Sequence, residues 1–320
     1  MASNPNFPPG LDIAPSLIPG EHQDVWEQQS AIQRFGIAGR IWEAAYLFDE
    51  YLEPPEGVEH DPPCSLIKID GRPKVVIELG SGTGYVGFRL AEQLAKKNHP
   101  TSSVAHRLIL TDLEDVCPLL EANWIKEREK LKIFEQADHL SVDLAVLPLP
   151  WGSYQHASSV YQFLRSPISS YPRTANSPPI FSHIVCSDLV YFPQLLAPLL
   201  RSLLHLTSSP FNPEAQVIIA CKSHKIRSLG KENAFWCAFG RWFSFEPVLV
   251  RSRESQMWSR LGSENSAFIF IARRKFRSLT WTVPPDDHSL LNNLGDAPVP
   301  NDGSDSFETL LLMGLDNIEA

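Results

Sequence analysis

The chain has 320 residues, and its 28 Lys and Arg against 37 Asp and Glu give a formal net charge of -9. Hydrophobic residues make up 43% of the sequence, which is enough for a large core and excludes a chain that is disordered throughout. The acids gather at the two ends: residues 281–320 hold eight and residues 1–30 hold four, and neither segment contains Lys or Arg. We therefore expect a slightly basic body, residues 31–280, between two acidic ends.

The sequence also argues against membrane and secreted classes. It has no apolar run of about 18 residues and no basic, then apolar, secretory signal at its N-terminus. Its five cysteines are widely spaced and form no C-x-x-C pair, which disfavours structural zinc and a disulfide framework. We expect a monomer of the cytoplasm, with the nucleus as a second location, that contacts no membrane and holds no metal.

The pattern of apolar residues predicts alternating strands and helices. Residues 1–30 are rich in proline and polar residues and are expected to be irregular. A helix is predicted over Ile41–Leu52, where Pro54 ends it, and a buried strand over Lys74–Leu79 leads through glycines into a helix over Val86–Lys97. The later strands are predicted at Arg107–Asp112, Leu140–Val142, Ile180–Ser187 and Gln216–Lys222, with helices at Cys117–Lys132 and Pro193–Leu206, and with Glu246–Arg253 and Ser266–Arg274 as a final antiparallel pair.

This alternation is typical of an α/β fold with a mainly parallel sheet. Residues 31–280 are predicted to form one domain, and the Ser-, Pro- and Tyr-rich residues 152–179 an insertion outside its core. Residues 281–320 form an acidic tail in which Phe307–Leu315 is a short apolar helix candidate. That segment either caps the domain or docks on a partner or on the basic body.

The strongest local signal is E-L-G-S-G-T-G at residues 78–84, where a buried strand opens into a helix. Such glycines let a ligand approach the backbone closely. Two sequence patterns fit these glycines. Gly82, Gly84 and Gly87 satisfy the dinucleotide-binding pattern G-x-G-x-x-G. Glu78, Gly80, Gly82 and Gly84 satisfy the pattern E-x-G-x-G-x-G. The strand ends at Leu79, so Gly80 occupies the tight turn, and this register favours the second pattern.

Two further strand ends carry candidate functional side chains. Asp112 ends the second predicted strand, where an acid accepts hydrogen bonds from ribose hydroxyls, although an acid there also serves as a helix N-cap. Asp188 and Tyr191 follow the strand that ends at Ser187, and strand ends near a switch point face the ligand. An N-cap aspartate and a core tyrosine are the structural alternatives. Trp42 and Trp151 are candidate flat surfaces for a cofactor base.

Taken together, these motifs resemble the seven-β-strand protein-lysine methyltransferases with a D-x-x-Y motif, also called methyltransferase family 16. The resemblance spans roughly residues 36–275. It is carried by the segments G-R-I-W-E-A-A at 39–45, E-L-G-S-G-T-G at 78–84, L-T-D-L at 110–113, L-P-W-G at 149–152 and S-D-L-V-Y at 187–191.

The resemblance implies a Rossmann-like sheet of order 3-2-1-4-5-7-6 with strand 7 antiparallel and helices on both faces. It implies S-adenosylmethionine as cofactor and methyl transfer to a protein lysine, with Asp188 and Tyr191 as the catalytic residues. The implied cofactor-binding residues are Trp42, Glu78, Gly80, Ser81, Gly82, Gly84, Asp112, Leu113, Trp151 and Ser187. Pro150 replaces the acid that often precedes the tryptophan of the W-G pair.

The resemblance leaves the acceptor open. The family acts on elongation factors and chaperones, which makes a protein of either kind the expected substrate. A histidine, an N-terminal amine or a small molecule is an alternative acceptor, and a catalytically inactive interaction protein with the same fold is a further alternative. Residues 201–280 hold 13 bases against five acids, but they contain no nucleic-acid-binding motif, so we expect no nucleic-acid partner.

Overall fold

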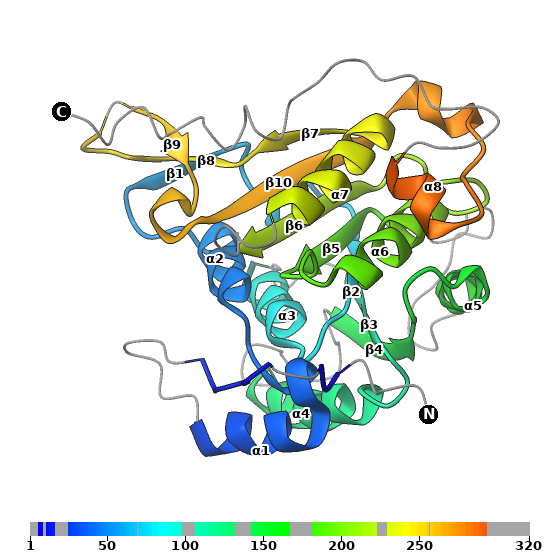
Figure 1. Cartoon of the computed structure of the whole chain (residues 1–320). Helices are drawn as coiled ribbons and strands as arrows, with labels where there is room; N and C mark the ends of the chain where they lie inside the picture. The colour runs from blue at the N-terminus through cyan, green and yellow to red at the C-terminus, as the bar shows by residue number, and fades with distance from the viewer. Residues whose placement is uncertain are drawn as a thin grey trace.

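A seven-stranded sheet forms the centre of the molecule (Figure 1). The computed structural model describes residues 6–8, 11–16, 25–68, 70–97, 106–131, 142–166, 181–222, 229–255 and 257–292. The strand order is β4-β3-β2-β5-β6-β10-β7, and β10 runs antiparallel to both of its neighbours while the first five strands are parallel. This is the order 3-2-1-4-5-7-6 expected from the sequence, with the last strand antiparallel, and the predicted fold class is confirmed.

The elements follow one another as strands and helices in alternation over most of the chain. The strands are β1 (Val58–Asp61), β2 (Val75–Leu79), β3 (His106–Asp112), β4 (Val142–Pro148), β5 (His183–Ser187), β6 (Gln216–Lys222), β7 (Phe243–Pro247), β8 (Leu249–Ser252), β9 (Ser259–Arg260) and β10 (Ala267–Arg274). The helices are α1 (Val25–Phe35), α2 (Glu43–Leu52), α3 (Tyr85–Lys97), α4 (Cys117–Leu131), α5 (Tyr154–Arg165), α6 (Pro193–Leu206), α7 (Leu229–Trp242) and α8 (Asp287–Asn292), with 3-10 turns at Gly36–Gly39, Ser65–Ile67, Ser263–Asn265 and Phe276–Thr280. None of these helices is long and apolar enough to cross a membrane.

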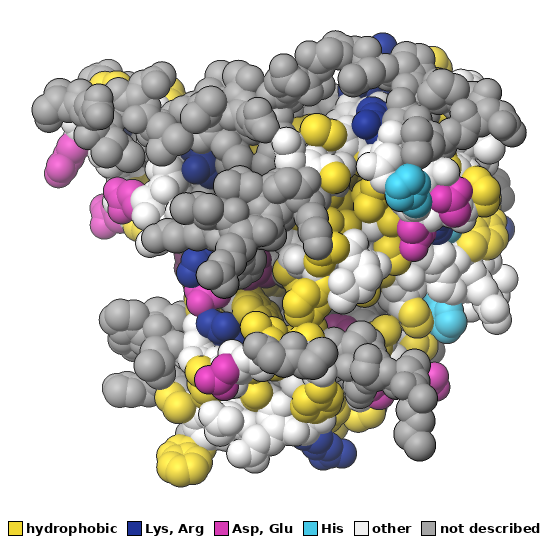
Figure 2. All heavy atoms as spheres, viewed as in Figure 1, with side chains coloured by type: hydrophobic (Ala, Val, Ile, Leu, Met, Phe, Trp, Pro, Cys, Tyr) yellow, Lys and Arg dark blue, Asp and Glu magenta, His cyan; other side chains and the backbone are white. Residues whose placement is uncertain are grey.

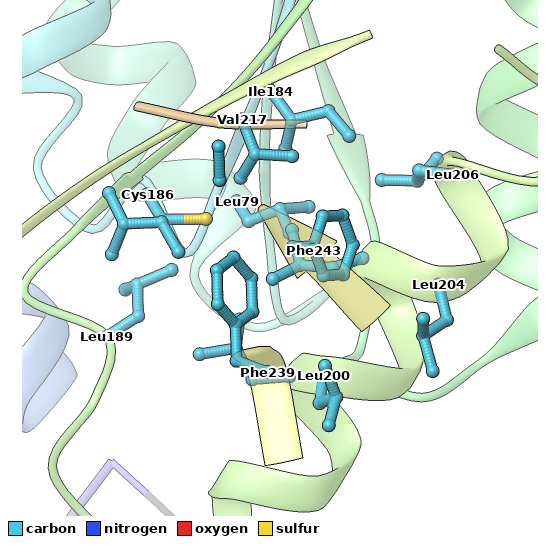
Figure 3. Close-up of a cluster of buried hydrophobic side chains, with 14 of the residues drawn as sticks. Leu79, Ile184, Cys186, Leu189, Leu200, Leu204, Leu206, Val217, Phe239 and Phe243 are labelled. Atoms are coloured by element: carbon cyan, nitrogen blue, oxygen red, sulfur yellow. The ribbon is translucent and has the colours of Figure 1, made fainter. Parts of the chain in front are cut away.

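Helices cover both faces of the sheet, which explains why its central strands consist mostly of apolar residues. Every residue of β2 is buried, as expected for a parallel strand between two helical layers. One face packs against α2, α3 and α4, and the other packs against α5, α6, α7 and α8. On the second face, Ile184 and Val217 of the sheet belong to one cluster with Leu200 of α6 and Phe239 of α7 (Figure 3).

The path of the chain differs from the sequence expectation at the N-terminus and around residue 160. Helix α1 begins inside the segment expected to be irregular, and its Gln28 accepts hydrogen bonds from the backbone N–H groups of Ser16 and Ile41. Helix α5 lies inside the expected insertion, yet its Ala157, Val160 and Leu164 are buried in the core. Their helical spacing is obscured in the sequence by the surrounding serines and tyrosines. Residues 167–180 lie outside the described residues.

The strand pairing near the end of the chain also differs from the prediction. The expected pair of Glu246–Arg253 with Ser266–Arg274 divides in two, because β10 pairs with β7, whereas β8 pairs with β1 and β9 in a separate three-stranded sheet. The chain changes sheets at Val248, which is fully buried and donates its N–H to the carbonyl of Ile269 over 2.9 Å. Helix α7 was not predicted, and the predicted Phe307–Leu315 helix lies outside the described residues.

Candidate active site

A cavity of about 420 Å³ opens at the carboxyl ends of the parallel strands. Because these strands run in one direction, the segments that follow β2, β3, β4 and β5 meet at one edge of the sheet. The cavity is lined by all but one of the residues predicted for the cofactor and the acceptor: Trp42, Glu78, Gly80, Ser81, Gly82, Asp112, Leu113, Trp151, Ser187, Asp188 and Tyr191. In the view of Figure 2, hydrophobic side chains gather near the middle of the molecule.

Gly80, Gly82 and Gly84 give the turn after β2 a shape that other residues adopt only with strain. Their φ angles are +57°, +56° and +85°. A Cβ on Gly80 would lie 2.8 Å from Leu189 and 2.9 Å from Trp151, so glycine is needed where the turn meets the cavity. Gly84 does not line the cavity, and a Cβ there would lie 2.5 Å from the ring of Phe88. Its role in this structure is to allow the packing of α3.

Hydrogen bonds join this turn to the end of β3. The N–H of Gly82 donates to Oδ2 of Asp112 over 2.8 Å, and the N–H of Leu113 donates to Oδ1 over 2.8 Å. The N–H of Ser81 donates to the carbonyl of Thr111 over 2.9 Å. A carboxylate offers about four lone-pair sites. Asp112 therefore holds the turn in place and keeps capacity to accept hydroxyl hydrogen bonds from a ligand.

Two buried acids lie at this end of the cavity. Glu78 is 4% exposed, and burial together with the charge of Asp112 raises its pKa to about 8. Burial also raises the pKa of Asp112 to about 6. Oε2 of Glu78 and Oγ of Ser187 are buried and have no hydrogen-bond partner among the described residues. Oε2 of Glu78 lies against α3, since a Cβ on Gly87 would be 2.6 Å from it. Buried polar atoms are normally paired, so Oγ of Ser187, a residue that lines the cavity, indicates a place for a polar ligand group.

Another wall of the cavity is formed by Asp188 and aromatic side chains. Asp188 has a φ of +58°, and its Oδ1 accepts the backbone N–H of Lys222 over 3.1 Å. The ring of Tyr191 contacts Trp151 edge-on at 6.4 Å between centroids and contacts Phe192 at 4.7 Å. Burial raises the pKa of Tyr191 above its usual value, so its phenol is neutral at neutral pH. This wall therefore offers one carboxylate among flat apolar surfaces.

The sequence did not reveal the part of the cavity that precedes Trp42. Ile37, Ala38 and Arg40 line it, together with Asn6 and Leu11 from the N-terminal segment. The carbonyl of Asn6 accepts the N–H of Ile37 over 2.9 Å. Gly39 and Arg40 belong to the segment G-R-I-W-E-A-A, but Asn6 and Leu11 lie in no pattern that indicates a site.

Part of the chain matches a known protein family. Residues 21–158 match the model of the family described as lysine methyltransferase. The match confirms the resemblance that the motifs indicated. It includes the glycine turn, Asp112 and Trp151 and ends within α5, before Asp188 and Tyr191.

The solved structures that match this chain are methyltransferases distant from it in sequence. A CurJ carbon methyltransferase is 10% identical over 64% of this chain and 50% of its own, with a TM-score of 0.38. An O-methyltransferase family protein from Burkholderia thailandensis is 10% identical over 72% and 56%, with a TM-score of 0.38. A TehB-like SAM-dependent methyltransferase from Corynebacterium glutamicum is 14% identical over 78% and 98%, with a TM-score of 0.35. The chain spans about half the length of the first two proteins.

Proposed function

We propose that the protein is an S-adenosylmethionine-dependent methyltransferase whose acceptor is the ε-amine of a protein lysine. The observation that carries the proposal is that the glycine turn, Asp112 and the pair Asp188 and Tyr191 all line one cavity. The match of residues 21–158 to the lysine methyltransferase family supports it. A protein of the translation or chaperone machinery is the first candidate substrate, and this part of the proposal rests on the family resemblance.

The residues present fit S-adenosylmethionine. Its methionine end carries a cationic ammonium, for which the acidic side chain of Glu78 and the unpaired Oγ of Ser187, both from residues that line the cavity, are suitable partners. The remaining lone pairs of Asp112 suit the ribose hydroxyls, and Trp151 and Leu113 offer apolar surface to the adenine. When bound, S-adenosylmethionine supplies an electrophilic methyl group on its sulfonium.

The wall formed by Asp188 and Tyr191 suits an amine acceptor. A lysine has an ordinary pKa near 10.4 and must lose its proton before it can act as a nucleophile. Asp188 would hydrogen-bond the ammonium and then orient the neutral amine, while the ring of Tyr191 favours a cationic or methylated nitrogen through its face. Orienting the two reactants in this way lowers the activation free energy by several kcal/mol, and by about 7–11 kcal/mol in the most favourable cases.

Other acceptors and a non-enzymatic role are the alternatives. A histidine, an N-terminal amine or a small molecule would also present a nitrogen or other nucleophile to this wall. An inactive interaction protein would keep the fold without the reaction. The protein is further proposed to act as a cytoplasmic or nuclear monomer without a nucleic-acid partner.

The test is to label proteins of a cell lysate with isotopic S-adenosylmethionine and the purified protein, and to identify the modified residue by mass spectrometry. The proposal expects methyl-lysine that is absent when Asp188→Asn is used. Label on another residue type would overturn the lysine assignment. Failure to detect S-adenosylmethionine binding by calorimetry would overturn the methyltransferase assignment itself.

A further inference from the structure

We infer that Arg40 binds the α-carboxylate of S-adenosylmethionine and so fixes the methionine end of the cofactor; this rests on the proposed function. S-adenosylmethionine carries two positive groups, the sulfonium and the α-ammonium, and one negative group, the α-carboxylate. The cavity holds three acids, Glu78, Asp112 and Asp188, that suit the positive groups and hydroxyls. The carboxylate needs a different partner.

Arg40 is the only Lys or Arg among the described residues that line the cavity. A carboxylate placed among acidic side chains without a cation would be disfavoured in this partly buried site. The guanidinium of an arginine forms a fork of N–H donors that matches a carboxylate. The charge composition of the cavity therefore assigns the negative end of the ligand to Arg40.

The neighbours of Arg40 hold its side chain in place and leave a donor unused. Its Nη2 pairs with Oε1 of Glu43 at 2.8 Å, and its Cζ lies 4.3 Å from the centroid of the Trp42 ring. The Trp42 ring is itself fixed, because its Nε1 donates to the carbonyl of Ile37 over 3.0 Å. The Nε of Arg40 is buried and has no hydrogen-bond partner among the described residues. A held guanidinium with an unpaired buried N–H is suited to an acceptor from a ligand.

Arg40 also lies on the loop that covers the glycine turn. A Cβ on Gly82 would lie 3.0 Å from the carbonyl oxygen of Ala38, which shows that the two backbones are in close contact. Both segments line the cavity, so a ligand group placed at the turn is near the loop that carries Arg40.

The backbone of the glycine turn is less able to bind the carboxylate than its glycines suggest. Helix N-terminal N–H groups often bind anions. Here the N–H groups of Ser81 and Gly84 donate to the carbonyls of Thr111 and Ser81, and that of Gly82 donates to Asp112. Three donors of the turn are thus engaged within the protein, whereas the buried Nε of Arg40 has no partner among the described residues.

The test compares ligands that differ only in the carboxylate. Calorimetry would measure the binding of S-adenosylmethionine and of decarboxylated S-adenosylmethionine to the full-length protein and to Arg40→Met. We expect Arg40→Met to weaken S-adenosylmethionine by about 10- to 100-fold, as for loss of a hydrogen bond between charged groups, and the decarboxylated ligand by less than about twofold. The matched control is Arg34→Met, because Arg34 is exposed, lies 5.1 Å from the ring centroid of Phe35 and is not part of the cavity.

The other possible results of these binding measurements would contradict the inference or the proposed function. Equal weakening of both ligands would show that Arg40 acts only by supporting Trp42, and unchanged binding of both would show that the carboxylate lies elsewhere; either result overturns the inference. If Arg40→Met fails to fold, Arg40→Lys keeps the charge without the fork, and it must weaken S-adenosylmethionine selectively for the inference to stand. If the unaltered protein binds neither ligand, it is the proposed function that fails.

Discussion

The N–H of Gly82 donates to Oδ2 of Asp112 over 2.8 Å, which ties the glycine turn after β2 to the end of β3. The motif residues of two strands, 30 positions apart in sequence, therefore act as one unit. The same carboxylate accepts the N–H of Leu113, so a single side chain both shapes the turn and faces the cavity.

Replacing Asp112 should damage stability and cofactor binding together. In Asp112→Ala the N–H groups of Gly82 and Leu113 lose their acceptor, and we expect a loss of about 1–3 kcal/mol in the free energy of unfolding. Urea unfolding and calorimetry with S-adenosylmethionine check this, with the exposed Glu114→Ala as control. Unchanged cofactor affinity in a folded Asp112→Ala protein would remove Asp112 from the cofactor site.

The buried acid Glu78 should make stability fall with rising pH. Its pKa is about 8 in the folded protein, well above the ordinary value of 4.5, so the folded state holds the proton more tightly than the unfolded state. The stabilising contribution is complete below pH 4.5 and is lost as the pH rises through about 8. Unfolding experiments should show this decline in the original protein and a smaller one in Glu78→Gln. Parallel pH profiles for the two proteins would contradict the prediction.

Asp188 should be needed for turnover and not for cofactor binding. Asparagine suits the test, because it tolerates the left-handed φ of +58° better than most residues. We expect Asp188→Asn to lower the methyl-transfer rate about 100-fold or more and to change S-adenosylmethionine affinity less than about twofold. Single-turnover kinetics and calorimetry separate the two effects. Loss of cofactor binding would place Asp188 in the cofactor site instead.

The docking of the N-terminal segment should depend on Gly36. A Cβ there would lie 1.8 Å from the carbonyl oxygen of Asn6, so Gly36→Ala must displace the segment that brings Asn6 and Leu11 to the cavity. We expect weaker S-adenosylmethionine binding by calorimetry. Gly71→Ala is the matched control, because Gly71 also has a positive φ, of +71°, but no atom within 4 Å of the added Cβ. Equal effects of the two variants would mean that backbone strain alone is responsible.

The first part of the acidic tail should stabilise the domain. The Trp281 ring contacts Trp242 edge-on at 5.5 Å, Arg201 donates to the carbonyl of Pro284 over 2.6 Å, and Leu290 is 1% exposed. Leu290→Ala should therefore cost about 2–5 kcal/mol in the free energy of unfolding.

A pair of truncations tests the same boundary. Removal of residues 281–320 should lower the melting temperature more than removal of 293–320, because only the longer deletion removes the contacts of Trp281 and Leu290. Equal melting temperatures for the two truncated proteins would mean that the domain ends at residue 280.

Much of the sheet could be predicted from local sequence. The apolar runs that became β2 and β6 are buried on both sides, and such strands show as continuous hydrophobic segments. Helix α5 could not be recognised in the same way, because its three buried residues stand among polar ones. The chain leaves the large sheet for the small one at Val248, between β7 and β8. This change depends on which distant strand each segment pairs with, and a single sequence does not contain that information.

For the site, the sequence by itself determined the residues at the strand ends, since glycines, acids and strand boundaries are local features and parallel strands bring their carboxyl ends together. Only the tertiary structure decided that Gly84 packs against Phe88 away from the cavity, and that Asn6 and Arg40 line it. The reason is physical: a motif specifies the conformation of its own segment, whereas the enclosure of a cavity depends on where distant segments pack, and that is set by the burial of side chains over the whole fold.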